Sequence, residues 1–219
     1  MDQVLIIGAS GGIGSALAAE AEARGAAAQR LSRQQDGFDI TDPASVAAHL
    51  GRLEGPFEAI WIATGILAPK GGAPEKALKA LEPAVMAQVF AVNAIGPALV
   101  IHQAARLLPR VRPSRIGVLS ARVGSIGDNR LGGWHSYRAS KAALNQIIRG
   151  AAIELGRTQP QAVLAALHPG TVETPFTQGY PREKLAPDKA AKALWGVLEG
   201  LAPGQSGGFF DYAGKPVPW

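Results

Sequence analysis

A tyrosine and a lysine four residues apart, Tyr137 and Lys141, are the pair in this chain best suited to proton transfer. They open a segment with helical periodicity, so their side chains point the same way and can meet over one turn. Ionising a free tyrosine at pH 7 costs about 4 kcal/mol. An ammonium about 4 Å away, at an effective dielectric constant of about 20, offsets about as much. The pair predicts a phenol that exchanges protons near neutral pH, although Tyr-x-x-x-Lys is also common as a surface or packing pair.

A glycine-rich turn near the N-terminus predicts a phosphate-binding site. It follows four apolar residues and precedes an alanine-rich segment with helical periodicity. Glycines permit a tight turn and let backbone N–H groups approach a diphosphate, while the helix directs its positive end at the anion. A glycine turn without a ligand is the alternative. The residues predicted to bind a dinucleotide here are Gly8, Ser10, Gly11, Gly12, Ile13 and Gly14.

The end of the second expected strand indicates which dinucleotide binds. In dinucleotide-binding folds an acidic residue at this place holds the ribose of NAD, whereas a basic one accommodates the 2′-phosphate of NADP. The chain reads Leu31-Ser32-Arg33, without a carboxylate. Because a guanidinium can bind phosphate through two parallel hydrogen bonds, Arg33 and the hydroxyl of Ser32 predict NADP(H) rather than NAD(H). An ordinary solvated arginine is the alternative.

The elements that position these groups alternate between strand and helix. Apolar runs predict strands over 4–7, 26–31, 57–63, 115–120, 161–167 and 208–212, and helical periodicity predicts helices over 12–24, 43–53, 83–108, 136–156 and 188–201. Continuously apolar strands are typical of a parallel sheet covered on both faces. We therefore expect the 219 residues to form one α/β domain over 1–219, a doubly wound parallel sheet of the Rossmann type.

Composition narrows the classes of function. Without cysteine the chain has no disulfide, no thiolate nucleophile and no cysteine-bound metal, and no metal site is expected. The net charge of +5 comes from scattered Lys and Arg residues, which favours a basic anion-binding cleft over nucleic-acid binding. The N-terminus resembles no signal peptide, and no apolar run of about 18 residues is expected to span a membrane. A cytoplasmic protein is the expectation.

Together these features resemble the short-chain dehydrogenase/reductase family. The resemblance lies in the glycine turn, the run Ser-Tyr-Arg-Ala-Ser-Lys at 136–141 and the segment Asn-Ala-Ile-Gly-Pro at 93–97. With the run 124–129 and the ending 208–219, these motifs are similar to those of the C-factor and sniffer-type carbonyl reductase subgroup. The resemblance implies a seven-stranded parallel sheet with helices on both faces.

The same resemblance assigns roles to further residues. Asn93 would hold a water that contacts Lys141, the alternative being a satisfied core amide. Asp39, followed by Ile40, would bind the adenine, the alternative for Asp39 being a polar residue at a strand end. Gly65 would lie beside the adenosine ribose. The turn after the strand 161–167 would hold the nicotinamide carboxamide through Pro169, Gly170, Val172 and Thr174.

One catalytic group of the family is missing from its expected place. A serine hydroxyl normally polarises the substrate carbonyl, and by position it would be the second residue of a Ser-Ser pair, which here reads Ser120-Ala121. Ser125, in the same loop and twelve residues before Tyr137, is the substitute we expect, with Ser120 as second choice. If neither reaches the carbonyl, turnover should be slow, because losing one oxyanion donor costs about 100-fold to 1000-fold.

The resemblance implies an NADP(H)-dependent carbonyl reductase. Tyr137 would donate the proton to the carbonyl oxygen. Lys141 would lower the pKa of Tyr137 and bind the nicotinamide ribose. Together with Asn93 and water, Lys141 would also relay a replacement proton. The alternative is an NADP-binding signalling or regulatory protein of C-factor type with little or no catalysis. A small carbonyl compound is the expected partner, and the helices beginning near residues 83 and 137 would form a homodimer or homotetramer, with a monomer still possible.

Overall fold

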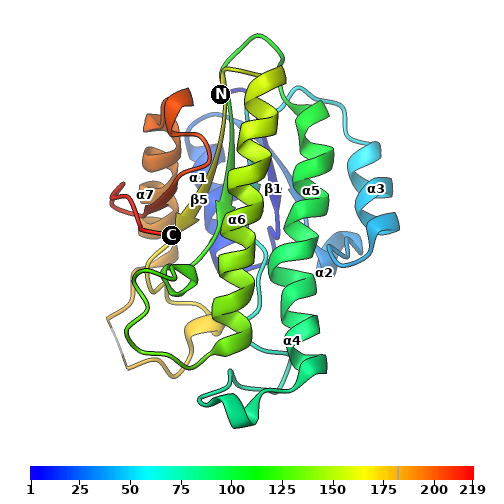
Figure 1. The fold of residues 1–219 in the computed structure, drawn as a ribbon. Helices are drawn as coiled ribbons and strands as arrows, with labels where there is room; N and C mark the ends of the chain where they lie inside the picture. The colour runs from blue at the N-terminus through cyan, green and yellow to red at the C-terminus, as the bar shows by residue number, and fades with distance from the viewer. Residues whose placement is uncertain (182) are drawn as a thin grey trace.

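The computed structural model describes residues 1–181 and 183–219, which form a parallel β-sheet between two layers of helices (Figure 1). Six strands lie in the order β2-β1-β3-β4-β5-β6, and every neighbouring pair is parallel. Their bounds are β1 Gln3–Ile7, β2 Ala27–Leu31, β3 Ala59–Ile62, β4 Ser114–Leu119, β5 Ala162–His168 and β6 Phe209–Asp211. The predicted class, a Rossmann-type parallel α/β sheet, is confirmed.

Helices cover both faces of this sheet because the strands are apolar on both sides. Leu5 and Ile7 of β1 face one core cluster, and Val4 and Ile6 face the other. The first cluster lies under α3, α5 and α6, and the second under α1 and α7. The helices are α1 Gly12–Ala23, α2 Arg33–Asp36, α3 Pro43–Gly51, α4 Pro83–Phe90, α5 Gly96–Ala104, α6 His135–Thr158 and α7 Pro187–Gly200.

The expected seventh strand is not among the strands of the described residues, and that expectation is wrong. The segment 37–40, which follows β2 in the chain, forms no strand. Between β2 and this segment lies the single turn of α2. A crossover between parallel strands needs about a dozen residues, so this connection is too short. Phe38 and Ile40 still pack into the core as loop residues.

The predicted long helix over 83–108 is continuous but irregular. It consists of α4, a π-helical turn at Ala91–Ile95, α5 and a final 3₁₀ turn at Ala105–Leu107. By length and composition alone this stretch of 25 residues would pass as a membrane-spanning helix, which corrects the expectation that no such run exists. In the fold it covers the sheet, with Val89, Val100 and Ile101 in the core, and 39% of its most apolar window is buried.

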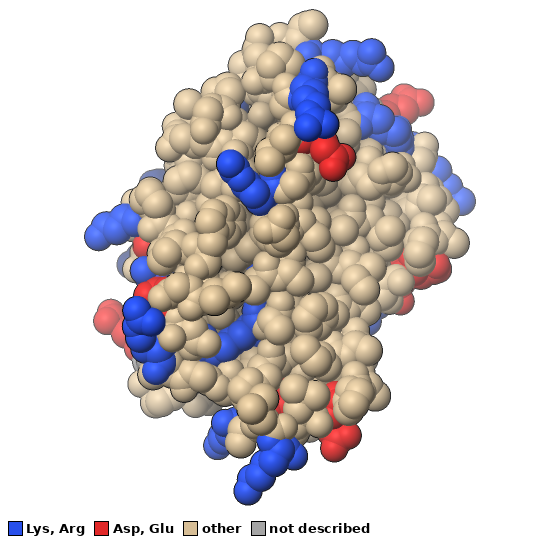
Figure 2. Space-filling view, viewed as in Figure 1, with Lys and Arg blue, Asp and Glu red and all other residues tan. Residues whose placement is uncertain are grey.

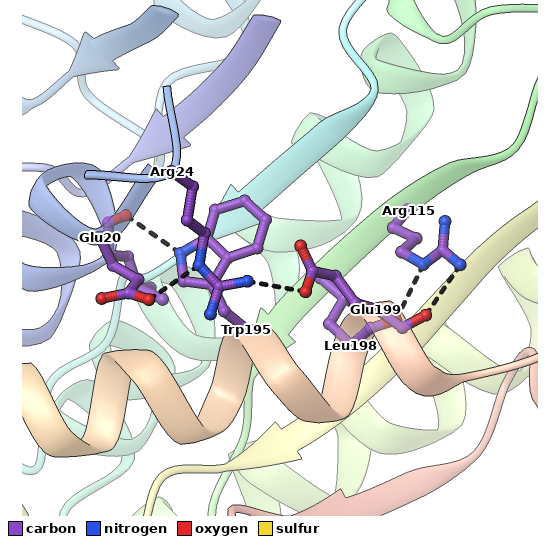
Figure 3. Close-up of polar contacts among 7 residues, drawn as sticks. Glu20, Arg24, Arg115, Trp195, Leu198 and Glu199 are labelled. Atoms are coloured by element: carbon purple, nitrogen blue, oxygen red, sulfur yellow. Dashed lines mark hydrogen bonds and ion pairs between the residues drawn. The ribbon is translucent and has the colours of Figure 1, made fainter. Parts of the chain in front are cut away.

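On the opposite face, charged side chains tie α7 to its neighbours (Figure 3). Arg24, just beyond α1, pairs with Glu20 and Glu199 at 2.7 Å each and lies over the ring of Trp195. Arg115 of β4 donates to the carbonyl oxygens of Leu198 and Glu199 at 2.9 Å each. These are carbonyls of the last turn of α7, where a cation is favoured by the helix dipole.

Candidate active site

A cleft of about 970 Å³ lies beyond the carboxyl ends of the strands. This is the edge at which open parallel sheets bind ligands. The cleft runs from the glycine turn after β1 to the loops that precede α6 and α7. Of the residues predicted from the sequence, it is lined by Ser10, Gly11, Gly12, Ile13, Gly65, Tyr137, Lys141, Pro169, Gly170, Val172 and Thr174.

The glycine turn delivers the start of α1 to one end of this cleft. Gly8 has a φ of +87°, and a Cβ there would lie 2.8 Å from the carbonyl oxygen of Ala63. A Cβ on Gly14 would collide with the carbonyl oxygen of Gly8, so the helix packs closely on the turn. The N-cap residue of α1 is Gly11, and no side chain of the described residues caps this helix. The N-terminal N–H groups of α1 are thus available to an anion in the cleft.

Tyr137 and Lys141 both lie buried in the cleft wall, at the N-terminal end of α6. Burial raises the pKa of the Tyr137 phenol above its ordinary value of 10, and the nearby phenol of Tyr180 raises it further. This direction is opposite to the lowering that we expected from Lys141. Burial also lowers the pKa of Lys141 to about 7, and its Nζ donates to the carbonyl oxygen of Leu119 at 2.8 Å. Desolvation disfavours a charge on either group and is the main cause of both shifts.

Asn93 occupies the π-helical turn and is fully buried. Its amide donates to the carbonyl oxygen of Ile66 at 2.8 Å and to Ser140 Oγ at 3.0 Å, and its Oδ1 accepts from the Ile66 N–H at 2.8 Å. A Cβ on Gly65 would lie 3.4 Å from Asn93 Oδ1 and 3.5 Å from Lys141 Nζ, so these two groups flank the same glycine. Asn93 thus lies behind the cleft wall, next to the lysine, and both alternatives predicted for it are compatible with this placement.

The serine expected to polarise a carbonyl does not face the cleft. Ser125 is 1% exposed, its hydroxyl lies 3.4 Å from the C-terminal Trp219 main-chain oxygen, and it accepts from the Asp128 N–H at 3.1 Å. Ser125 is therefore outside the cleft lining, contrary to our expectation. Ser120 lines the cleft, but its hydroxyl donates to Asn145 Oδ1 at 2.6 Å. Ala121, the position at which the resemblance implies the family's serine, lines the cleft.

Of the residues predicted to bind the adenosine half, Gly65 lines the described cleft and the other four lie beyond it. Ser32, Arg33, Asp39 and Ile40 are not part of its lining. Ser32 caps α2, since its hydroxyl accepts from the Gln35 N–H at 3.2 Å. The pKa of Asp39 is lowered chiefly by hydrogen bonds from Thr41, with a further contribution from the charge of Arg33. Arg33 and Asp39 are therefore neighbours on the surface past the end of β2.

The turn after β5 forms the wall opposite the glycine turn. A Cβ on Gly12 would lie 2.5 Å from Thr174 Cγ2, so the two turns come into direct contact. Gly170 has a φ of +80°, which favours glycine at this bend. Burial lowers the pKa of His168 to about 4, so this strand-end histidine is neutral near pH 7. The predicted residues of this turn therefore lie at the cleft.

Several residues of the cleft were not predicted from the sequence. Aromatic rings surround Tyr137: its ring centroid lies 6.3 Å from that of Trp134 and 5.9 Å from that of Phe176, and Tyr180 lies 5.6 Å from Trp134. Arginines also line this end, at positions Arg122, Arg130 and Arg138, and Figure 2 shows basic side chains beside the loop that precedes α6. The sequence signal that could have indicated this aromatic cluster is Trp134, three residues before Tyr137.

The described residues contain no group of three His, Cys, Asp or Glu side chains that could hold a metal ion. The cleft instead combines an anion-binding helix start with a buried phenol and amine, which suits a phosphate-bearing ligand and proton transfer.

Comparisons with known proteins agree with this arrangement. A family model described as enoyl-(acyl carrier protein) reductase matches residues 18–197. The C-signal protein of Myxococcus xanthus is 38% identical over 147 residues, which cover 65% of this chain and 84% of that protein. The 1-hydroxy-2-glutathionyl-2-methyl-3-butene dehydrogenase of Rhodococcus sp. strain AD45 is 29% identical over 237 residues and 100% of both chains.

Solved structures share the fold over the whole chain. A short-chain dehydrogenase/reductase structure from Burkholderia multivorans with bound NADP has a TM-score of 0.82 and 29% identity, covering 100% of this chain and 99% of that one. The carbonyl reductase Sniffer of D. melanogaster, at 21% identity, has a TM-score of 0.83 over 100% of both chains. Because the family model matches well over half of the residues, and the fold and the Tyr-x-x-x-Lys geometry agree with it, the chain belongs to the short-chain dehydrogenase/reductase family.

Proposed function

We propose that this protein is an NADP(H)-dependent oxidoreductase that reduces an aldehyde or ketone to an alcohol, with Tyr137 as the proton donor. The observation that carries the proposal is one continuous cleft. It joins the uncapped start of α1 and its glycine turn to the buried side chains of Tyr137 and Lys141. Anion binding at one end and proton transfer at the other are the two capacities that such a reaction needs.

The residues present fit a dinucleotide. Gly12 and Ile13 offer N–H groups at the start of α1 to the diphosphate, whereas the N–H of Gly11 is already bonded to the carbonyl oxygen of Gly8 at 3.0 Å. Thr174 faces this helix start from the neighbouring turn. Two polar atoms at the cleft walls, Thr64 Oγ1 and His168 Nδ1, are buried without a hydrogen-bond partner in the described chain. When bound, a reduced nicotinamide supplies the hydride. The presence of Arg33 rather than a carboxylate directly after β2, and the NADP in the Burkholderia structure, support NADP(H) over NAD(H), although the Asp36 carboxylate accepts from the N–H and hydroxyl of Ser32 at 2.7 and 3.2 Å.

The chain's own residues supply the proton. Since burial raises the pKa of Tyr137, its phenol is protonated near pH 7 and can donate a hydrogen bond, and then its proton, to the carbonyl oxygen. The carbon gains the hydride and the oxygen the proton, so the product is an alcohol. Lys141, with a pKa of about 7, can return a proton to the site at neutral pH, with Asn93 beside it.

The proposal is tested with the variant Tyr137→Phe, which keeps the ring and its contacts but removes the hydroxyl. We expect carbonyl reduction to fall by about 100-fold or more, because the positioned proton donor is lost. Binding of NADPH, measured by fluorescence titration, should stay unchanged. A parallel titration with NADH compares the two cofactors. A Tyr137→Phe variant that turns over like the wild type would contradict the mechanism.

A second candidate function is favoured by two observations. The C-signal protein of Myxococcus xanthus is among the similar proteins, and Ala121 lacks the hydroxyl that the family's reaction uses. Together they favour a signalling or regulatory protein that binds NADP with little catalysis. A panel of aldehydes, ketones and quinones, followed by the loss of NADPH absorbance, separates the two: tight NADPH binding without oxidation on any substrate supports signalling.

A further inference from the structure

A buried carboxylate that the proposed reaction does not use lies at the start of α6. Glu75 belongs to the loop between β3 and α4, 61 residues before Ser136 in the chain, and is 7% exposed. One carboxylate oxygen accepts a hydrogen bond from the Ser136 hydroxyl, and the other accepts from the Ser136 N–H at 3.3 Å. The main-chain oxygen of Glu75 accepts from the Trp134 N–H at 2.5 Å. The loop is thus bonded to the start of the helix at three points.

Helix α6 has no capping side chain of its own among the described residues. Its N-cap is Trp134, which adopts a left-handed conformation with φ of +52° that costs a residue other than glycine some strain. N-cap side chains usually accept from the second or third N–H of a helix. Ser136 is the second residue of α6, and its N–H donates to the Glu75 carboxylate. Glu75 therefore makes the capping bond from a loop that is distant in the sequence.

The charge of Glu75 suits this place. Burial works against ionisation of the carboxyl, but hydrogen bonds from the side chain and N–H of Ser136 hold its pKa below the ordinary value. The carboxylate is therefore charged near pH 7, beside the positive end of the helix dipole, where an anion is stabilising.

The bonds of Glu75 act next to the reactive residue. Tyr137 directly follows Ser136, and from the other side its carbonyl oxygen accepts from Ser140 Oγ at 2.8 Å. Ser140 in turn accepts from Asn93, which is bonded to Ile66 at the beginning of the same loop. The loop between β3 and α4 therefore holds the first turn of α6 at both of its ends.

We propose that Glu75 is a positioning residue for Tyr137: it caps α6 from the β3–α4 loop and fixes where the phenol stands in the cleft. This inference rests on the proposed function for its kinetic consequence, but the capping itself does not depend on that function.

The test compares Glu75→Ala and Glu75→Gln with the control Glu82→Gln. Glu82 is an exposed glutamate at the N-cap of α4 whose side chain makes no capping bond, so the control removes a similar charge without removing a cap. Four quantities are measured: amide hydrogen exchange at residues 135–139, the Tm, the Kd for NADPH, and kcat for reduction of an aldehyde. Ser136→Ala, which removes one of the bonds, serves if Glu75→Ala does not fold.

We expect Glu75→Ala to lose exchange protection in the first turn of α6 and to lower kcat by about 10-fold to 100-fold, since small displacements of a catalytic group are costly. The Kd for NADPH should be unchanged. Glu75→Gln keeps one acceptor oxygen for the Ser136 N–H, and its NH2 group can donate to the Ser136 hydroxyl, so it should restore most of both losses. Ser136→Ala should lie between Gln and Ala. Glu82→Gln should match the wild type.

Wild-type exchange and kcat in Glu75→Ala would overturn the proposal, as would a lower Tm with unchanged kcat, which would indicate a merely structural contact. If the wild type itself reduces no carbonyl compound, the proposed function fails and the role for Tyr137 fails with it. The exchange result then still decides whether Glu75 caps α6, so the two failures are distinguishable.

Discussion

At the scale of single residues, the departure with the largest consequence is Ala121. It lines the cleft where the family's serine hydroxyl would polarise the carbonyl, and neither nearby serine replaces it. Ser125 is bonded to the C-terminal residue, and the hydroxyl of Ser120 is committed to Asn145. The carbonyl oxygen would then receive a hydrogen bond from Tyr137 without the usual second donor, which predicts a slow enzyme.

The variant Ala121→Ser should therefore raise turnover. Its hydroxyl would enter the cleft beside Tyr137, and a restored oxyanion donor is worth up to about 100-fold to 1000-fold in kcat. We expect a gain of at least about 10-fold, measured as kcat for one aldehyde at saturating NADPH, with the Kd for NADPH unchanged.

An unchanged kcat in Ala121→Ser would mean that another hydroxyl already serves the carbonyl. The first to examine is Tyr180, whose hydroxyl is buried without a hydrogen-bond partner in the described part of the chain. Its ring lines the same cleft and packs on Trp134. In that case Tyr180→Phe should lower kcat in the wild type.

Burying the amine of Lys141 in the cleft wall lowers the stability of the folded protein near pH 7. Burial lowers its pKa from 10.5 to about 7 in the folded protein, so between these pH values the unfolded chain binds one proton more. Stability contributed by this residue therefore rises with pH from about 7 to about 10.5. Lys141→Met removes the penalty and should stabilise the protein near pH 7 by an amount on the order of a few kcal/mol, while abolishing proton relay.

Urea unfolding of both proteins at several pH values between about 6 and 10 checks this prediction. The advantage of Lys141→Met should shrink as the pH rises towards 10.5, because the unfolded wild type then begins to lose its lysine proton as well and folding has less charge to remove. A difference in unfolding free energy that does not change with pH would show that packing, rather than the buried charge, sets the cost.

At the scale of elements, local patterns carried most of the prediction. The apolar runs and helical periodicities place all six strands and the main helices to within a few residues, since each reflects burial of a whole face. Tyr137 and Lys141 could be paired because one helix sets their spacing. The place of Ser125 could not be predicted, because Ser125 is bonded to Trp219, which lies 94 positions further on in the sequence. Glu75 was missed for the same reason, since its partner lies 61 positions further on.

The carboxyl ends of the strands form the cleft, whereas contacts at their amino ends stabilise the fold, and Arg115 tests this distinction. It lies at the amino end of β4, away from the cleft, and donates to the last carbonyls of α7. Arg115→Ala removes two charge-assisted bonds and part of the packing, which should cost about 1–3 kcal/mol. For a chain of this size each kcal/mol lowers Tm by about 2–4 °C. The catalytic rate at a temperature well below Tm should not change.

Arg112→Ala is the matched control in thermal unfolding. Arg112 precedes the same strand, is 56% exposed and pairs with Glu58 at 3.0 Å, and an exposed pair of this kind contributes little. Its Tm should stay near that of the wild type. Equal Tm values for the two variants would show that the bonds to α7 do not stabilise the fold.

At the scale of the whole molecule, one face carries few charged side chains over its middle. Figure 2 shows a broad area free of Lys, Arg, Asp and Glu over the middle of α5 and α6. A groove of about 590 Å³ runs between these helices. Its lining is mainly apolar, with Ile101, Ala105, Ile147 and Ala151, and includes polar side chains at His102, Gln146, Glu154 and Thr158. The most apolar window of the stretch Pro83–Leu107 is only 39% buried, although it includes core residues. An apolar face of this extent is typical of a contact between subunits.

We therefore expect a homodimer through α5 and α6, and Gly150 provides a direct test. Gly150 lines the groove, and a Cβ added there would meet no atom within 4 Å, so Gly150→Arg fits the folded subunit but places a charged side chain in the contact. Gly196 of α7, on the opposite helical layer, has the same open surroundings and gives the control Gly196→Arg. In sedimentation velocity at micromolar concentration, the wild type and Gly196→Arg should be dimers and Gly150→Arg a monomer. A monomeric wild type, or a dimeric Gly150→Arg, would exclude this face as the interface.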